Sequence, residues 1–330
     1  MNLATIPSNI RRRLGRYAFA VFTAGIVVGK LHPFPTLRLL IPFALLMMLF
    51  PAFLDMDRGR LSSIASSPLP FLTALSLNIL LSPLLMYALT EIIRGNKITA
   101  LTAGLLIFGM IPAGGMGPAY TAMLGGNVNL SLAISAVSLF LSLGTVPLWS
   151  LVLLDRIVTV PVLLITKYFF LIILLPMISA LVVKGWVTRR FGEPTFLNVK
   201  GVLGDFSVLG MMMLLFIIPV VNGRLIKDSP SFILELILPA ASFSLLLLVT
   251  ATVAGRALRL PYRDRIALTI GATTKNTAIA MALATTAFSG REALSIAVAG
   301  PLVQLPVMLC YLNIQTRLSA GRTKIAKDDR

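Results

Sequence analysis

The chain has 330 residues, of which 57% are hydrophobic and only 12% are charged. A soluble domain of this length needs more polar surface, and the charges here fall between long apolar runs, so the composition excludes a soluble globular protein and indicates an all-α bundle in lipid. The formal net charge of +17 does not indicate nucleic-acid binding, because the basic residues lie in short connections without a zinc knuckle, a Gly-rich phosphate loop or a basic-aromatic groove.

Ten apolar runs, most of them near the roughly 20 residues that cross a bilayer core, predict ten membrane-spanning helices. They cover residues 17–31, 37–54, 69–93, 98–124, 129–153, 158–183, 201–223, 231–254, 265–289 and 292–314. The first run is short and follows four arginines, so it resembles a signal peptide, but no small-x-small cleavage site follows it. We expect a retained first span; a cleaved leader is the alternative.

The basic residues predict the orientation. With ten spans, both termini lie on one side of the membrane. The connections on that side hold 19 Lys and Arg, against 8 on the other side, while Lys167 and Lys275 lie within runs. Because basic connections stay in the cytoplasm, we expect both termini to be cytoplasmic, in a multi-pass protein of the plasma or inner membrane.

An internal match suggests two halves of five spans, residues 1–157 and 158–330, joined through the long basic connection 184–200. Residues 126–134, Gly-Asn-Val-Asn-Leu-Ser-Leu-Ala-Ile, resemble residues 290–298, Gly-Arg-Glu-Ala-Leu-Ser-Ile-Ala-Val, so a constant offset carries Gly126 onto Gly290 and Ser131 onto Ser295. Because five is odd, the second half would enter the membrane from the opposite side, which is the inverted repeat of many secondary transporters. A chance resemblance between two apolar segments is the alternative.

The fourth run contains a cluster of residues that interrupt helices: Pro112, Gly114, Gly115, Gly117 and Pro118. Proline removes a backbone donor and glycine weakens a helix by about 1 kcal/mol, so this segment should not be a regular helix. At membrane depth, such backbone is tolerated where protein or a water-filled cavity satisfies it, and its free ends can bind an ion or substrate. A simple proline kink is the alternative.

The offset of the internal match places this break on a polar stretch of the ninth run: Thr273, Thr274, Lys275, Asn276 and Thr277. Lys275 follows Arg265 by ten residues, so a helix would carry it about 15 Å into the membrane. A cation at that depth is costly unless a partner or cavity stabilises it, which makes Lys275 the strongest candidate for a functional residue. Structural pairing with helix carbonyls is the alternative.

Serines recur in the fifth run at helical spacing: Ser131, Ser135, Ser138 and Ser142. They should line one face of the helix, where small polar residues serve packing or ligand binding. Ser131 and Ser135 are candidate ligands because they follow the first break closely. Lys167 lies early in its run, so we expect it to reach the interface instead.

The sequence contains one cysteine and one histidine, Cys310 and His32. They allow no intrachain disulfide and no clustered metal site, so we expect neither a metal nor a cofactor. A membrane-embedded enzyme would need acid–base residues deep in a span, and the sequence places none there.

Three stretches resemble the superfamily of bile acid:sodium symporters and arsenical-resistance permeases. Residues 112–131 resemble the Pro-Gly-Gly … Gly-Asp/Asn … Leu-Ser pattern of the symporter branch, and residues 275–278 resemble its Gln-Asn-Ser/Thr stretch. Residues 300–309, Gly-Pro-Leu-Val-Gln-Leu-Pro-Val-Met-Leu, are closer to the arsenical branch. The resemblance implies ten helices as two inverted repeats, a core and a panel domain, with broken helices four and nine crossing at the binding site.

The same resemblance implies transport of an organic anion or oxyanion, often driven by sodium. The Ser-Asn sodium ligands of that pattern fall on Gly117 and Pro118 here, the Glu of the ninth span falls on Gly271, and the Gln falls on Lys275. Ser131 and Ser135 match ligand positions. The resemblance therefore implies sodium sites that this chain has lost.

We predict alternating-access transport of a small organic anion where spans four and nine cross, with Lys275 replacing a bound sodium ion. A desolvated amine at this position could carry a coupling proton, whereas sodium dependence is doubtful. Asn276, Thr273, Thr274 and the backbone around Gly114–Gly117 would supply hydrogen bonds. An arsenite or oxyanion exporter, a membrane-embedded enzyme and a passive channel remain as alternatives.

Overall fold

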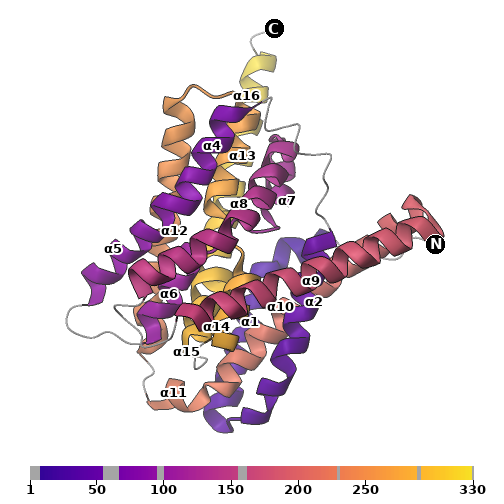
Figure 1. The fold of residues 1–330 in the computed structure, drawn as a ribbon. Helices are drawn as coiled ribbons and strands as arrows, with labels where there is room; N and C mark the ends of the chain where they lie inside the picture. Colours follow the sequence, from indigo (N-terminus) through magenta and orange to yellow (C-terminus); the bar gives the residue numbers. More distant parts are fainter. Residues whose placement is uncertain are drawn as a thin grey trace.

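The computed structural model describes residues 8–54, 67–94, 100–154, 162–228, 231–287 and 291–328. These residues form helices and connections, with one isolated antiparallel bridge and no strand in the described ranges. The helices are α1 (Ser8–Leu31), α2 (Ile41–Leu54), α4 (Pro68–Ser76), α5 (Ser82–Arg94), α6 (Ala100–Met110), α7 (Gly117–Met123), α8 (Val128–Trp149), α9 (Val162–Phe191), α10 (Glu193–Val221), α11 (Gly223–Asp228), α12 (Phe232–Ala257), α13 (Tyr262–Thr273), α14 (Thr277–Ala287), α15 (Arg291–Ala297) and α16 (Leu305–Asp328). Figure 1 shows their arrangement.

In the described residues, each predicted apolar run overlaps helical structure. The runs 98–124 and 265–289 each contain two helices separated by an interruption. Within the described ranges, five segments are long and apolar enough to cross a membrane: 68–92, 128–154, 169–191, 233–257 and 292–317. Shorter apolar helices cover residues 35–51, 206–221 and 277–286. The chain is therefore multi-helical and suited to a membrane, while the full set of ten spans stays a prediction.

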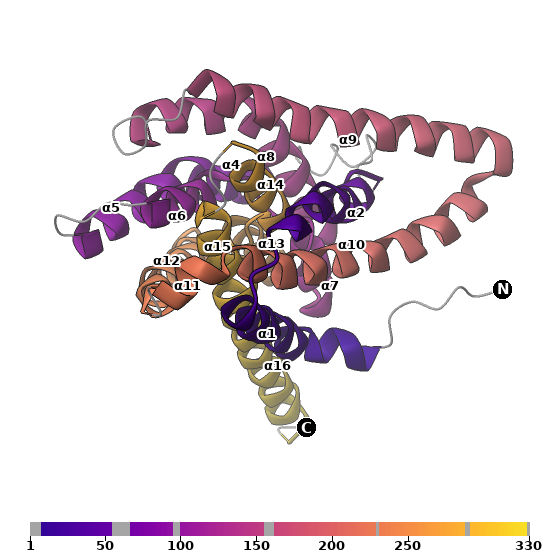
Figure 2. The same cartoon turned by 90° about the horizontal axis from the view of Figure 1, so that it is seen from below.

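The helices pack in two groups. One contains α1, α2, α9, α10 and α11, in which α10 contacts each of the other four, and the other contains α4–α8 with α12–α16 (Figures 1 and 2). Helix α14 of the second group contacts α2 and α9 of the first. In the first group, α1 approaches the α10 backbone closely: a Cβ at Gly25 would lie 2.7 Å from the Phe216 carbonyl oxygen, and one at Gly29 would lie 2.7 Å from that of Pro219. Small residues four apart allow this close packing.

The sequence predicts a hydrophilic connection at residues 184–200, and in the structure this segment is almost entirely helical. Helix α9 continues to Phe191 and α10 begins at Glu193, so only Gly192 is non-helical between them. Gly192 has φ 82°, a left-handed conformation that glycine adopts without the steric cost of a Cβ. The two helices thus form a tight hairpin that protrudes from the bundle (Figure 2).

Polar contacts join the starts of α4, α8 and α13. The Asn127 side chain accepts a hydrogen bond from the Leu130 N–H, capping α8, and its amide donates to Asp264 in the first turn of α13 (2.8 Å). The Ser67 hydroxyl, just before α4, donates to the other oxygen of Asp264 (3.0 Å). A carboxylate in a first helical turn is also favourable for the helix dipole. These contacts fix the entry of the helices that lead to the interrupted segments.

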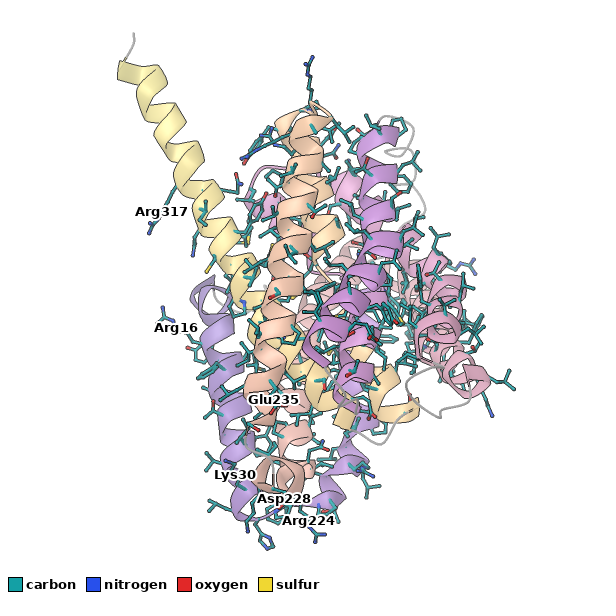
Figure 3. The ribbon with its side chains drawn as sticks, turned by 90° about the vertical axis from the view of Figure 1, so that its left-hand side faces the viewer. Arg16, Lys30, Arg224, Asp228, Glu235 and Arg317 are labelled. Carbon is teal, nitrogen blue, oxygen red and sulfur yellow. The ribbon has the colours of Figure 1, made fainter. Side chains whose placement is uncertain are left out.

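The labelled charged residues lie at different heights of the molecule. Figure 3 shows Lys30, Arg224 and Asp228 together at the lower end, whereas Arg16 and Arg317 lie higher, on α1 and α16. The sequence predicts Lys30 and Arg224 on the outer surface and Arg16 and Arg317 on the inner one. Which end faces the cytoplasm stays a prediction, and the expected repeat boundary at 157/158 and Gly290 of the internal match lie outside the described residues.

Candidate functional site

Two interrupted helical segments lie against each other in the second group. The first interruption separates α6 from α7, and the second separates α13 from α14. Their backbones hydrogen-bond across the contact: the Gly114 N–H donates to the Thr274 carbonyl (2.8 Å), and the Asn276 N–H donates to the Pro112 carbonyl (2.9 Å). The residues between these pairs, Ala113 and Lys275, form the isolated antiparallel bridge. Backbone groups that lost helical partners are thus satisfied by the other interruption.

Gly114 allows this contact because it has no side chain. A Cβ at this position would lie 2.7 Å from the carbonyl oxygen of Lys275, a distance that would force the two backbones apart. Gly115, next in sequence, is exposed, and a Cβ there would meet no atom within 4 Å. The two adjacent glycines therefore have different roles in the structure.

Lys275 is enclosed between three elements and is only 2% exposed. Its Nζ donates to the carbonyl oxygens of Asn78 and Ile111, both at 3.1 Å, and its backbone N–H donates to Oε1 of Gln304 (3.1 Å). An ammonium group has three N–H donors, so the two carbonyls leave one without an acceptor among the described residues. No described carboxylate forms an ion pair with this buried ammonium.

The Asn78 carbonyl is available because the helix changes its hydrogen-bond register there. Residues Leu77–Leu81 form a π-helical turn in which the Ser82 N–H donates to the Leu77 carbonyl instead of that of Asn78. Pro83, the next residue, has no N–H to offer. The carbonyl of the neighbouring Ile79 lacks an α-helical donor, because that donor would be Pro83, and it accepts from the Trp149 indole N–H (2.8 Å). Ile111 lies one residue beyond the end of α6, where carbonyls lack partners and a cation is favoured.

Asn78 and Gln304 contact Lys275, but neither was predicted from the sequence. Asn78 is 1% exposed; its amide donates to the Ala272 carbonyl (3.3 Å), while its Oδ1 is buried without a hydrogen-bond partner. The sequence signal that could have identified Asn78 is a polar amide within an apolar run, shortly before Pro83. Gln304 lies in the stretch that resembles the arsenical branch, at the position where that pattern has Glu.

The serines of α8 contact the first interruption, as their spacing on one face suggests. The Ala113 N–H donates to the Ser138 hydroxyl (3.1 Å), and the Ser135 hydroxyl donates to the Gly114 carbonyl (3.4 Å). The Ser131 hydroxyl accepts from Thr121 in α7 (3.1 Å). The Ser135 and Ser138 hydroxyls therefore bond the interrupted backbone, whereas Ser131 bonds the following helix, α7.

The remaining predicted residues divide into those that build the second interruption and those that begin α7. Asn276 caps α14, because its Oδ1 accepts from the Ile279 N–H (3.3 Å). The Thr273 hydroxyl donates to the Thr269 carbonyl within its own helix (2.7 Å). The Thr274 hydroxyl is buried and has no hydrogen-bond partner among the described residues. Thr277 begins α14 and packs against Gly300, while Gly117 and Pro118 begin α7.

In this arrangement, two main-chain carbonyls accept hydrogen bonds from the ammonium group of Lys275. Oriented carbonyls at interrupted helices are also the ligands of sodium ions in transporters. Orphan polar groups at the same place, the Asn78 Oδ1 and the Thr274 hydroxyl, leave hydrogen-bonding capacity for a small polar ligand.

The sequence model of the sodium bile acid symporter family matches residues 42–229, which are more than half of the chain. The matched range includes the first interruption and ends before α12. No curated protein matches the chain.

Proposed function

Since the chain belongs to the sodium bile acid symporter family, we propose that it is a secondary active transporter of a small organic anion, in which the ammonium group of Lys275 replaces a bound sodium ion. Members of this family are transporters and not enzymes, so a membrane transporter is the coarse conclusion. The observation that carries the finer proposal is the enclosure of the Lys275 Nζ by two main-chain carbonyls at the crossing of interrupted helices.

A fixed ammonium supplies the charge that a sodium ion would supply to the same carbonyls. The resemblance places a Ser-Asn sodium pair at Gly117 and Pro118, which have no side-chain oxygens. Lys275 therefore stabilises the two backbone interruptions without an ion from solution. The expected consequence is transport that does not depend on sodium, with a proton as the available coupling ion.

An anionic substrate fits the unbalanced charge of the site. Burying a cation without a carboxylate is costly, and no carboxylate among the described residues pairs with the Lys275 ammonium. The carboxylate or sulfonate of a substrate would supply the missing negative charge and an acceptor for the remaining N–H donor. The unpartnered Asn78 Oδ1 and Thr274 hydroxyl would add hydrogen bonds near that group.

The pairing of the two interruptions supports an inverted repeat. Pro112 and Asn276, whose backbones hydrogen-bond, are separated by the same offset as Gly126 and Gly290 of the internal sequence match. Residues related by a two-fold axis in the membrane plane would meet in this antiparallel manner at the axis. The group α1, α2, α9, α10 and α11 would then be the panel domain and the group α4–α8 with α12–α16 the core domain, which move relative to each other during alternating access.

The test is an uptake screen with purified protein in proteoliposomes, using labelled carboxylates, sulfonated anions and arsenite. We expect saturable uptake of an organic anion that a proton gradient makes concentrative. Linear, non-saturating flux would indicate a channel. Transport of arsenite alone, together with raised metalloid tolerance of expressing cells, would replace the organic-anion proposal with oxyanion export.

A further inference from the structure

Gly185, in the middle of α9, has no packing explanation. A glycine inside a helix costs about 1 kcal/mol relative to alanine, so it usually marks a close approach of another segment. At Gly25, Gly29 and Gly114 a Cβ would collide with backbone, but at Gly185 it would meet no atom within 4 Å. The missing side chain thus leaves open space on the outer surface of the helix.

This space belongs to an open, shallow recess of about 580 Å³ on the surface of α9. Its lining residues all come from α9: Leu181, Val182, Gly185, Trp186, Arg189 and Arg190. Their spacing of three and four residues puts them on one broad face. An apolar stripe with Leu175 (62% exposed) and Ile178 (55% exposed) continues from the recess toward the middle of the helix.

The recess combines positive charge with unused hydrogen-bond donors. Arg189 and Arg190 are exposed, and neither forms an ion pair or hydrogen bond with a described residue. The indole of Trp186, 61% exposed, packs edge-on against Phe191. Lys184 differs, because its ammonium lies over the Phe196 ring of α10, 5.5 Å from the centroid. Two guanidinium groups beside an interfacial tryptophan are suited to a phosphate ester.

The surroundings favour a lipid as the source of that phosphate. Only 22% of the apolar window of α9 is buried, the lowest value of the five long apolar segments in the described ranges. Figure 2 shows α9 along the edge of the molecule. We propose that this recess binds the headgroup of an anionic phospholipid, with its phosphate at Arg189 and Arg190 and its acyl chains along Leu175, Ile178 and Val182.

The experiment measures lipid binding by native mass spectrometry of the full chain in detergent, with added phosphatidylglycerol or phosphatidylcholine of the same acyl chains. We expect the wild type to retain phosphatidylglycerol preferentially. The double variant Arg189→Gln/Arg190→Gln should lose about thirtyfold in apparent affinity, from two charges near the headgroup. The matched control is Arg256→Gln/Arg263→Gln, which removes two exposed arginines elsewhere.

Gly185→Leu separates a specific recess from diffuse charge attraction, because it fills the space without changing the charge. Leucine raises helix propensity, so folding should be retained, and we expect loss of phosphatidylglycerol selectivity. Gly144→Leu, at another helical glycine with open space around it, should bind as the wild type does. Undiminished binding by Gly185→Leu, or an equal loss in the Arg256/Arg263 control, would overturn the proposal.

Discussion

At the scale of single residues, the charge of Lys275 is stabilised by backbone geometry and not by an opposite charge. Its two acceptors, the carbonyls of Asn78 and Ile111, are free because one helix changes register and another ends. A carbonyl dipole stabilises a cation less completely than a carboxylate does, so the ammonium remains attractive to an anion. The Lys275 side chain would therefore both attract an anion and hold the two interrupted segments through its hydrogen bonds.

Asn78→Ala tests the side-chain part of this environment. The substitution removes the unpartnered Oδ1 and the hydrogen bond to Ala272 but keeps the carbonyl that holds Lys275. Loss of one hydrogen bond to substrate, about 0.5–1.5 kcal/mol, should raise KM up to about tenfold with little change in kcat. Uptake kinetics measure this, and the control is Thr73→Ala on the same segment, where the hydroxyl bonds only within its own helix. An unchanged KM would remove Asn78 from the substrate site.

Lys275 was predictable from the sequence, because a single cation deep in an apolar run has few structural explanations. Its partners were not predictable in the same way. Main-chain carbonyls carry no residue signature, and the π-helical turn that frees the Asn78 carbonyl depends on packing around Pro83 as well as on its sequence. Helical spacing predicted that Ser131 and Ser135 share one face, while their role as ligands stays a prediction.

At the scale of elements, the two interruptions satisfy each other's backbone. Proline and glycine make the α6–α7 interruption predictable, since they weaken any helix whatever surrounds it. The α13–α14 interruption contains no proline, so it was expected as a break only from the internal offset and from the family resemblance. The helical hairpin at Gly192 was not predicted, because charged residues extend amphipathic helices beyond the apolar run as readily as they form loops.

Gly114→Ala tests the contact between interruptions. The added methyl would lie 2.7 Å from the Lys275 carbonyl, so overpacking should destabilise the protein by about 1–3 kcal/mol and lower uptake. Gly115→Ala is the matched control, because its methyl enters open space and should change stability by no more than about 0.5 kcal/mol. Thermal unfolding in detergent compares the two variants. Equal melting temperatures would show that close backbone contact is not required.

At the scale of the whole molecule, the helices form two groups. Along the chain, the helices occur where the sequence has its apolar runs. Apolar run length predicts helices well, because a helix must satisfy its own backbone in lipid. Contacts between distant helices, such as α1 with α10, were not predictable from run lengths. The internal sequence match is the exception, because its offset relates Pro112 to Asn276, and these residues are paired across the two interruptions.

The predicted orientation is tested by cysteine labelling in intact cells, with Cys310 replaced by Ser. Both Asp228→Cys and Arg190→Cys place a thiol at an exposed position. Because basic connections face the cytoplasm, a membrane-impermeant maleimide should label Asp228→Cys in intact cells and Arg190→Cys only after permeabilisation. The reverse pattern would invert the topology, and labelling of both positions would contradict a polytopic arrangement with these sites on opposite sides.

The central claim, that the Lys275 ammonium takes the place of a sodium ion, is tested most directly by initial uptake rates in proteoliposomes with sodium or choline as the external cation. We predict equal rates for the wild type in the two media. Lys275→Ala should lower the rate about tenfold to a hundredfold through loss of charge-assisted hydrogen bonds, while Lys167→Ala, at an exposed position, should leave it unchanged. A strict requirement of the wild type for sodium, or full activity of Lys275→Ala, would contradict the account.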